Sequence, residues 1–296
     1  MSSPAPPDRS TLSAALSAAY VEACLGELAA LKPGNVHVHA EGHGMSVADF
    51  ERSARVSAAP LTAPGSPVGQ RILDAVRATR AAVGCNTNLG IVLLAAPLLA
   101  AAEDALPGGL RQAVAGVLAQ LTVADAVAAY EAIRIASPAG LGQVAEQDAA
   151  AVPTVDLRRA MALAAERDLI AREYATDFAA VFDLGVARLA VEHARGTAPE
   201  WATSHVYMDF LGAFADTHIA RKYGNDAAAM VRAEASAVTA SLAHATLDGR
   251  RETLLAFDQS LKRRGFNPGS AADLTVASLL ACACQNILAV DKNEKI

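Results

Sequence analysis

The chain of 296 residues carries 25 Lys and Arg against 31 Asp and Glu, and this net charge of −6 excludes the basic footprint of a general nucleic-acid-binding protein. Hydrophobic residues make up 53% of the chain but aromatic residues only 4%, so small aliphatic side chains, alanine above all, predict closely packed helices. The length would allow two domains of about 150 residues, but no linker divides the sequence, and we expect an all-α fold: a single-domain, alanine-rich multi-helix bundle.

The first ten residues are rich in proline and serine and predict a disordered tail, which leaves residues 11–296 as the helical domain. No basic stretch followed by an apolar one indicates a signal peptide. The longest apolar run, Leu89–Ala102, is too short for a bilayer, which needs about 20 residues. The cysteines, Cys24, Cys85, Cys282 and Cys284, contain no CxxC pair. We therefore expect reduced thiols, a cytoplasmic protein and no membrane partner.

Ser10 can cap a first helix, which Pro33 and Gly34 end. Glu22 lies beside the apolar face of this helix, so its carboxylate either points into a cavity or reaches solvent from the boundary. Lys32 stands at the C-terminal end of the helix, at the start of a loop.

The loop that follows contains three histidines, His37, His39 and His43, within seven positions. They resemble metal ligands, but no cysteine or carboxylate completes a known spacing. The sequence favours surface or substrate-loop histidines and leaves a metal role open.

Several further helices are marked by caps and helical periodicity. Ser46 and Asp49 form a capping box that opens a helix ending near Ala59, before Pro60. The remaining segments in the first half of the chain run from Ser66 and Pro67 to Gly84, over residues 109–121, and over residues 123–135 behind a Thr122 and Asp125 capping box.

Cys85–Gly90 is a short polar stretch that opens onto a buried apolar helix over residues 91–102. Free N–H groups and the positive end of the helix dipole beside neutral side chains suit a phosphate or a ribose. The alternative is that Asn86 or Asn88 is only the N-cap of the helix.

The second half of the chain begins with a break at residues 137–142, and no helical pattern resumes before Asp156. A long helix is then predicted from Asp156 through Ala175, on which Asp168 and Arg172 can pair at i and i+4.

Asp209 and Asp216 follow seven residues apart, nearly on one face of a predicted helix. His218, Arg221 and Lys222 come next, before Gly224 ends the helix. Carboxylates for magnesium beside cations for phosphate are what a nucleoside triphosphate requires.

A turn at Asn267, Pro268 and Gly269 precedes the last helix, which Ser270 can cap. Asp273 then falls in the first turn, where a dipole-stabilised carboxylate could bind a metal or orient a hydroxyl. A capping box between Ser270 and Asp273 explains the same residues.

Six segments in this order resemble the landmarks of the triphosphoribosyl-dephospho-CoA synthases, from residue 22 to about residue 280. These segments are Lys32–Val36, Asn86–Gly90, Gly140–Gly142 with Asp148, Arg167–Ala171, Asp216–Gly224 and Asn267–Leu274. The loop over residues 36–45 lacks the Asn-Asn-Gly-Ala-His type of sequence of the best-known members. The chain thus resembles more closely the shorter branch found in archaea and one-carbon-metabolising bacteria.

The resemblance implies an all-α enzyme that transfers the triphosphoribosyl part of ATP to the 2′-hydroxyl of dephospho-CoA, or to a related acceptor, and releases adenine. It implies Mg²⁺ as cofactor and ATP as co-substrate; a homodimer is compatible with the alanine-rich surface. The alternatives are a nucleotide N-glycohydrolase and a non-catalytic nucleotide-binding protein.

Our hypothesis assigns roles to the residues of these segments. We assign binding of the triphosphate to Lys32, Arg221 and Lys222, and binding of Mg²⁺ to Asp216 with Glu22 or Asp168. Nucleotide binding falls to Asn86, Thr87, Asn88 and Asn267, and the catalytic base is Asp273 or His218, with Asp209 as the alternative.

Overall fold

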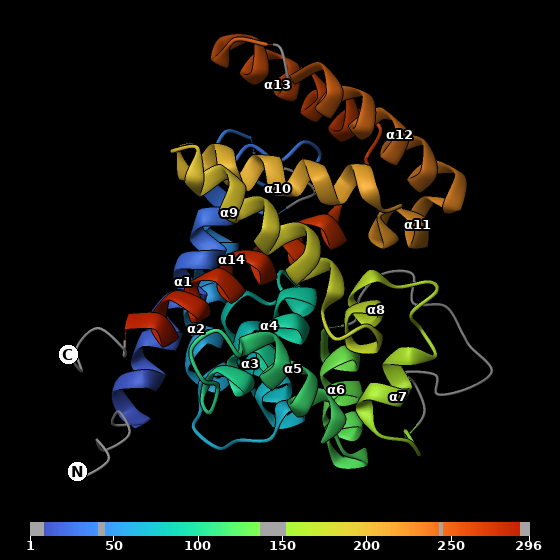
Figure 1. The fold of residues 1–296 in the computed structure, drawn as a ribbon. Helices are drawn as coiled ribbons and strands as arrows, with labels where there is room; N and C mark the ends of the chain where they lie inside the picture. Colours follow the sequence, from blue (N-terminus) through green and yellow to red (C-terminus); the bar gives the residue numbers. More distant parts are fainter. Residues whose placement is uncertain (1–8, 41–44, 137–151, 243–244, 291–296) are drawn as a thin grey trace.

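A computed structural model describes residues 9–40, 45–136, 152–242 and 245–290, and within them it contains only helices and loops. The elements in chain order (Figure 1) are α1 (Arg9–Ala29), α2 (Val47–Leu61), α3 (Val68–Val83), α4 (Leu89–Ala102), α5 (Leu110–Ala119), α6 (Val123–Ala136), α7 (Leu157–Ala162), α8 (Leu169–Ala175), the π-helical segment η1 (Val181–Val186), α9 (Ala187–Ala194), α10 (Pro199–Ala213), α11 (Thr217–Tyr223), α12 (Asn225–Leu242), α13 (Leu247–Arg263) and α14 (Gly269–Val290). The all-α prediction is confirmed.

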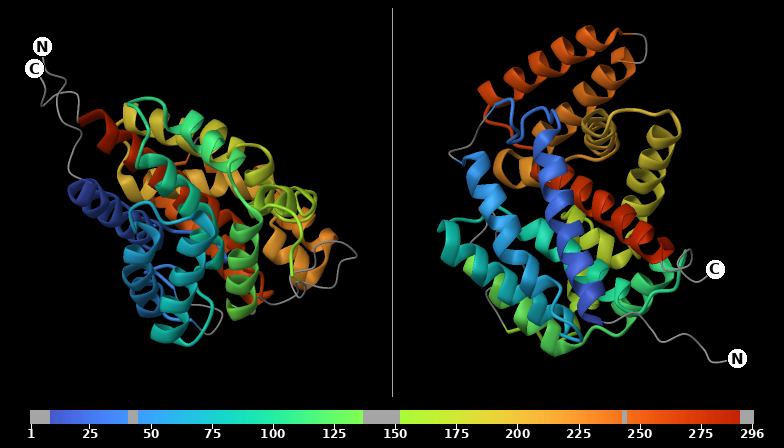
Figure 2. Two further views of the ribbon diagram at one scale, coloured as in Figure 1. Left: turned by 90° about the horizontal axis from the view of Figure 1, so that it is seen from below. Right: turned by 90° about the vertical axis from the view of Figure 1, so that its left-hand side faces the viewer.

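The last helix, α14, lies in the middle of the molecule, where it packs against α1, α4, α10 and η1. Figure 2 shows that α1 (blue) and α14 (red), from opposite ends of the sequence, cross next to each other. Ala271, Ala277 and Ala281 of α14 are buried, and their small side chains let neighbouring helices approach closely. One core therefore joins both ends of the described chain.

The helix α4 is apolar on all sides because it is surrounded by protein. It packs against α3, α5 and α14, and nearly all of its side chains are buried. The N-terminus of α4, which follows the polar stretch at residues 85–88, therefore lies in the interior of the protein.

Two capping boxes are confirmed. Ser46 and Asp49 exchange hydrogen bonds at the start of α2, and Thr122 and Asp125 do the same at the start of α6. Gly84 ends α3 with a left-handed φ of 73°, as predicted. Pro60 does not end α2, which continues to Leu61.

Three local predictions are wrong. The helix expected over residues 156–175 is two helices, because the Asp168 carboxylate caps a new helix by accepting the N–H groups of Ile170 and Ala171. Asp209 and Asp216 do not share a helix, since α10 ends at Ala213 and Asp216 caps α11.

The third concerns Ser270, which lies inside α14 and bonds Thr217 rather than forming a capping box with Asp273. Asp273 lies just beyond the first turn of α14.

Parts of the sequence predictions lie outside the described residues: the tail over residues 1–8, His43, the break at residues 137–142, and Asp148. Arg9 and Ser10, expected in the tail and as a cap, already belong to α1. All four cysteines are free, as expected.

By length and composition alone, α1 and residues 269–289 of α14 could cross a membrane. In α14, 61% of that apolar stretch is buried inside the protein.

The crossing of α3 and α6 yields a stability prediction. A Cβ atom on Gly69 would lie 2.4 Å from Asp125 Cα and 2.5 Å from its carbonyl oxygen, and backbone cannot rotate away. We expect Gly69→Ala to lower the free energy of unfolding by about 1–3 kcal/mol or more. Gly116→Ala, where nothing lies within 4 Å, is the control and should raise it by about 0.5–1 kcal/mol. Urea unfolding measures both, and equal midpoints for Gly69→Ala and the unsubstituted protein would contradict the prediction.

Candidate active site

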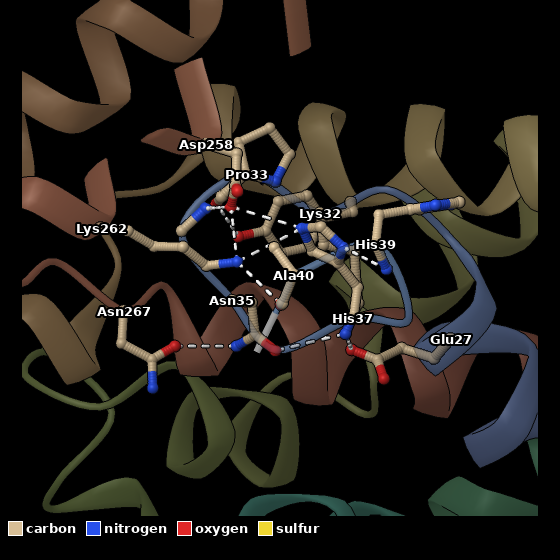
Figure 3. Close-up of polar contacts among 12 residues, drawn as sticks. Glu27, Lys32, Pro33, Asn35, His37, His39, Ala40, Asp258, Lys262 and Asn267 are labelled. Atoms are coloured by element: carbon tan, nitrogen blue, oxygen red, sulfur yellow. Dashed lines mark hydrogen bonds and ion pairs between the residues drawn. The ribbon is translucent and has the colours of Figure 1, made fainter. Parts of the chain in front are cut away.

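The loop after α1 places a lysine inside the protein (Figure 3). Lys32 is completely buried, forms an ion pair with the buried Glu27, and donates to Asn35 Oδ1 at 3.2 Å. Burial raises the pKa of Glu27 and lowers the pKa of Lys32, while their mutual attraction opposes both shifts. Asn35 Nδ2 donates in turn to Asn267 Oδ1 at 2.8 Å. Two of the predicted segments therefore meet through Asn35 and Asn267, which are 232 residues apart in the sequence.

The histidines of this loop do not gather around a common point. His37 is buried, with Nε2 3.3 Å from Asp258 Oδ1, and its Nδ1 accepts the N–H of His39 at 3.2 Å. His39 is exposed, beside Arg251. No group of three or more His, Cys, Asp or Glu within the described ranges could hold a metal ion by itself.

The stretch before α4 both caps the helix and lines the site. Asn86 Oδ1 accepts the N–H of Leu89 at 3.1 Å, whereas Asn88, which holds the N-cap position of α4, makes no side-chain hydrogen bond to the helix. Thr87 Oγ1 bonds Ser53 Oγ at 2.6 Å, and Asn88 Nδ2 donates to Ser57 Oγ at 3.2 Å.

Asn88 also lines a narrow crevice between α1, α2 and α4 that has a volume of about 10 Å³. Glu27 and Phe50 line the same crevice. The amide of Asn88 is thus close to the Glu27–Lys32 pair.

Asp273 of α14 faces the first turn of α4. A Cβ atom on Gly90 would lie 2.0 Å from Asp273 Oδ2, so only glycine leaves room for this carboxyl group. Burial raises the pKa of Asp273 well above the usual range, the carboxylates of Asp216 and Glu27 raise it further, and Arg221 opposes the shift. Asp273 therefore holds its proton more readily than an ordinary carboxyl group.

Asp216 ties two helix N-termini together. It is buried, and its carboxylate accepts the N–H groups of His218 at 2.9 Å, Ile219 at 3.2 Å and Ala271 at 2.9 Å. Burial raises its pKa to about 6 against the effect of these donors. Next to it, Thr217 Oγ1 bonds Ser270 Oγ at 2.8 Å, while the His218 ring lies against Gly269. The starts of α11 and α14 are thereby fixed beside Asp273.

Arg221 completes this side of the site. Its Nη1 donates to Asp168 Oδ2 at 2.6 Å, so Asp168 pairs with Arg221 rather than with Arg172. The Nε atom of Arg221 is buried and has no hydrogen-bond partner among the described residues. An unpaired buried donor is costly, and an anionic ligand oxygen would satisfy it.

Three predicted residues do not lie with the others. Glu22 is exposed and lines a separate depression of about 320 Å³ with Glu200. Asp209 pairs with Arg188 at 2.9 Å in a cluster on α9 and α10. Lys222 is exposed, with its ammonium group 5.1 Å from the centre of the Tyr223 ring.

Two residues of the site were missed by the sequence analysis. Glu27 follows Ala19 and Ala23 at the spacing of one helical turn, and this position on the buried face could have identified it. Asp258 gave no such signal, because two of its partners, Gly34 and His37, are more than 200 residues away in the sequence.

The chain is similar to known proteins in sequence and in fold. The model of the family described as ATP:dephospho-CoA triphosphoribosyl transferase matches residues 13–291. A Pseudomonas putida protein, named "Probable 2-(5''-triphosphoribosyl)-3'-dephosphocoenzyme-A synthase", is 36% identical over 110 residues. That match spans 37% of this chain and only 39% of the relative.

A crystal structure from Archaeoglobus fulgidus, described as a candidate triphosphoribosyl-dephospho-CoA synthase, has the same fold. It aligns with a TM-score of 0.60 at 23% identity, over 80% of this chain and 98% of that one. Because the family model covers nearly the whole sequence, the resemblance seen in the six segments is confirmed, and the chain belongs to the ATP:dephospho-CoA triphosphoribosyl transferase family.

Proposed function

We propose that this protein transfers the triphosphoribosyl part of ATP to a hydroxyl of dephospho-CoA, or of a related acceptor, and releases adenine. Membership of the transferase family supports the reaction class. The observation that carries the proposal is the position of Asp273, whose carboxyl group lies against Gly90 with Lys32 and Arg221 within electrostatic reach.

The chemistry requires a proton donor and a proton acceptor. The N-glycosidic bond at C1′ of ATP breaks, an O-glycosidic bond forms, and the sugar carries positive charge between the two events. Because the pKa of Asp273 is raised, its carboxyl group can protonate the departing adenine. His218, on the first turn of α11, is the proposed base for the acceptor hydroxyl.

The triphosphate would bind where cations and helix N-termini meet. Arg221 supplies the buried Nε donor that lacks a partner, and the first turns of α4 and α14 add the positive ends of two long helices. Lys32 can reach a phosphate only if its ammonium group leaves Glu27, since the side chain is closed to solvent. The crevice beside Asn88 has room for about one water molecule, so its walls must separate when ATP binds.

Mg²⁺ belongs to this proposal as the partner of the triphosphate. Such an ion usually takes one or two protein carboxylates and completes its shell with phosphate oxygens and water. Asp168 fits this role because its side chain is 22% exposed beside Arg221. Asp168 and Asp216 each already accept three donors, but Asp216 is more restricted because it is buried, and Glu22 lies in a different depression.

The remaining parts of the proposal concern the setting of the enzyme. We propose a cytoplasmic protein that binds small molecules, without a nucleic-acid or membrane partner. The net charge of −6 and the four free cysteines support these assignments. The alanine-rich helical surface is compatible with a homodimer, which size-exclusion chromatography with light scattering would detect.

The decisive experiment follows free adenine by chromatography. The purified protein is incubated with ATP and Mg²⁺, with and without dephospho-CoA, and we expect adenine only when the acceptor is present. EDTA should suppress the reaction. Adenine formed without an acceptor would indicate a glycohydrolase instead, and the absence of adenine with dephospho-CoA would contradict the proposed reaction.

A further inference from the structure

We propose that Asp258 of α13 is a positioning residue for this reaction, because it fixes the loop that carries Lys32 and Asn35. The inference rests on the proposed function of that loop in binding ATP. Neither the predicted site residues nor the family match assigns a role to Asp258.

Asp258 receives three donors at one buried point (Figure 3). Its side chain is only 3% exposed. Its Oδ1 atom accepts the N–H of Gly34 at 2.8 Å and the ammonium group of Lys262 at 3.0 Å, and it lies 3.3 Å from His37 Nε2. A buried carboxylate needs such partners, so Asp258 and its donors hold one another in place.

The hydrogen bonds of His37 define its tautomer. Because Nδ1 accepts the N–H of His39, the ring hydrogen sits on Nε2, which points at Asp258. Burial lowers the pKa of His37, which keeps the ring neutral. His37 is therefore a fixed donor that holds the middle of the loop on α13.

The helix α13 contacts the loop at two further points. Gly34 has a left-handed φ of +84° and packs so closely on Leu261 that a Cβ atom would lie 2.9 Å from Leu261 Cδ1. Further along the loop, Lys262 donates to the carbonyl oxygen of Ala40 at 2.9 Å.

Lys32 and Asn35 belong to the same loop and contact Glu27 and Asn267. Any shift of the loop relative to α13 therefore moves Lys32, which we place at the triphosphate, and Asn35, which accepts a hydrogen bond from it. A displacement of about 1 Å can cost as much as 10²-fold in rate or binding.

The test compares Asp258→Asn with a control variant at the contact between α12 and the end of α13, which does not involve the loop. Glu234→Gln removes the ion pair in which Arg264 Nη1 and Nη2 lie 2.9 and 2.6 Å from the Glu234 carboxylate, so it loosens α13 from α12 only. We expect Asp258→Asn to raise the KM for ATP by about 10- to 100-fold with a smaller change in kcat. Glu234→Gln should leave the KM for ATP unchanged.

Two measurements do not depend on turnover. Hydrogen exchange of the Gly34 amide should become faster in Asp258→Asn but not in Glu234→Gln, and calorimetric titration with ATP and Mg²⁺ should show the same loss of affinity. If Asp258→Asn does not fold, Lys262→Met removes the hydrogen bond to Ala40 and should also weaken ATP binding.

The outcomes separate the two proposals. Faster exchange at Gly34 with unchanged affinity for ATP would overturn the positioning role, since the loop would then be freed without consequence. An equal loss of affinity in Glu234→Gln would also overturn it, because general loosening of α13 would be the cause. If the unsubstituted protein binds no ATP, the proposed function is contradicted, and the role of Asp258 that rests on it is contradicted as well.

Discussion

Replacing Asp273 with asparagine is expected to lower the rate of adenine release by about 10²- to 10⁴-fold while the helical circular dichroism stays the same. Asparagine has nearly the same shape and fits the space against Gly90, but it cannot give a proton to the departing base. The rate is measured with saturating ATP and dephospho-CoA. A rate within about threefold of the unsubstituted protein, far short of the effect of losing a general acid, would exclude Asp273 as that acid.

The pH dependence gives the same residue a second test. With Asp273 as the acid, the unsubstituted enzyme should lose activity as the pH rises through the raised pKa of this group, because only the protonated form can donate. The residual activity of Asp273→Asn should lack that decline. Asp183→Asn is a matched control, since this carboxylate is exposed and paired with Arg111 away from the site. Its pH profile should equal that of the unsubstituted protein.

The fold class could be predicted from the sequence because alanine-rich composition and caps act locally. The capping boxes at Ser46 and Thr122 appeared as predicted, each from residues three positions apart. The two helix breaks, at Asp168 and between Asp209 and Asp216, were missed because they depend on contacts that are not local in the sequence. Asp168 has the helical periodicity of its neighbours, and only its partners, the N–H groups that it caps and Arg221 from α11, show that the helix restarts there.

The site was predictable in its segments but not in its contacts. Lys32, Asn88, Asp273 and Arg221 were identified from motifs; Asp273 lies within electrostatic reach of Lys32 and Arg221, and Asn88 lines a crevice with Glu27, the partner of Lys32. Glu22 was named from the sequence and Glu27 was not considered, but the buried carboxylate of α1 is Glu27, which packs beside α2 and α4. Asp258 depends on a contact 224 residues away in the sequence, which no local pattern contains.

Substitution of Lys32 with methionine is expected to have the largest effect on stability. Methionine fills similar space but leaves Glu27 buried without its partner, and removing one member of a buried pair costs about 3–5 kcal/mol. Protonation of Glu27, whose pKa is already raised by burial, will limit the loss at low pH. Urea unfolding at neutral pH measures the effect, and adenine release should fall below detection.

The double variant Lys32→Met with Glu27→Gln separates structure from function. It removes both charges together and so avoids the uncompensated buried charge that makes the single substitution costly. We therefore expect most of the unfolding free energy to return while adenine release stays absent, because the triphosphate still lacks its lysine. Should the double variant regain both, Lys32 serves only to neutralise Glu27, and binding of the triphosphate then rests on Arg221 and the helix N-termini beside it.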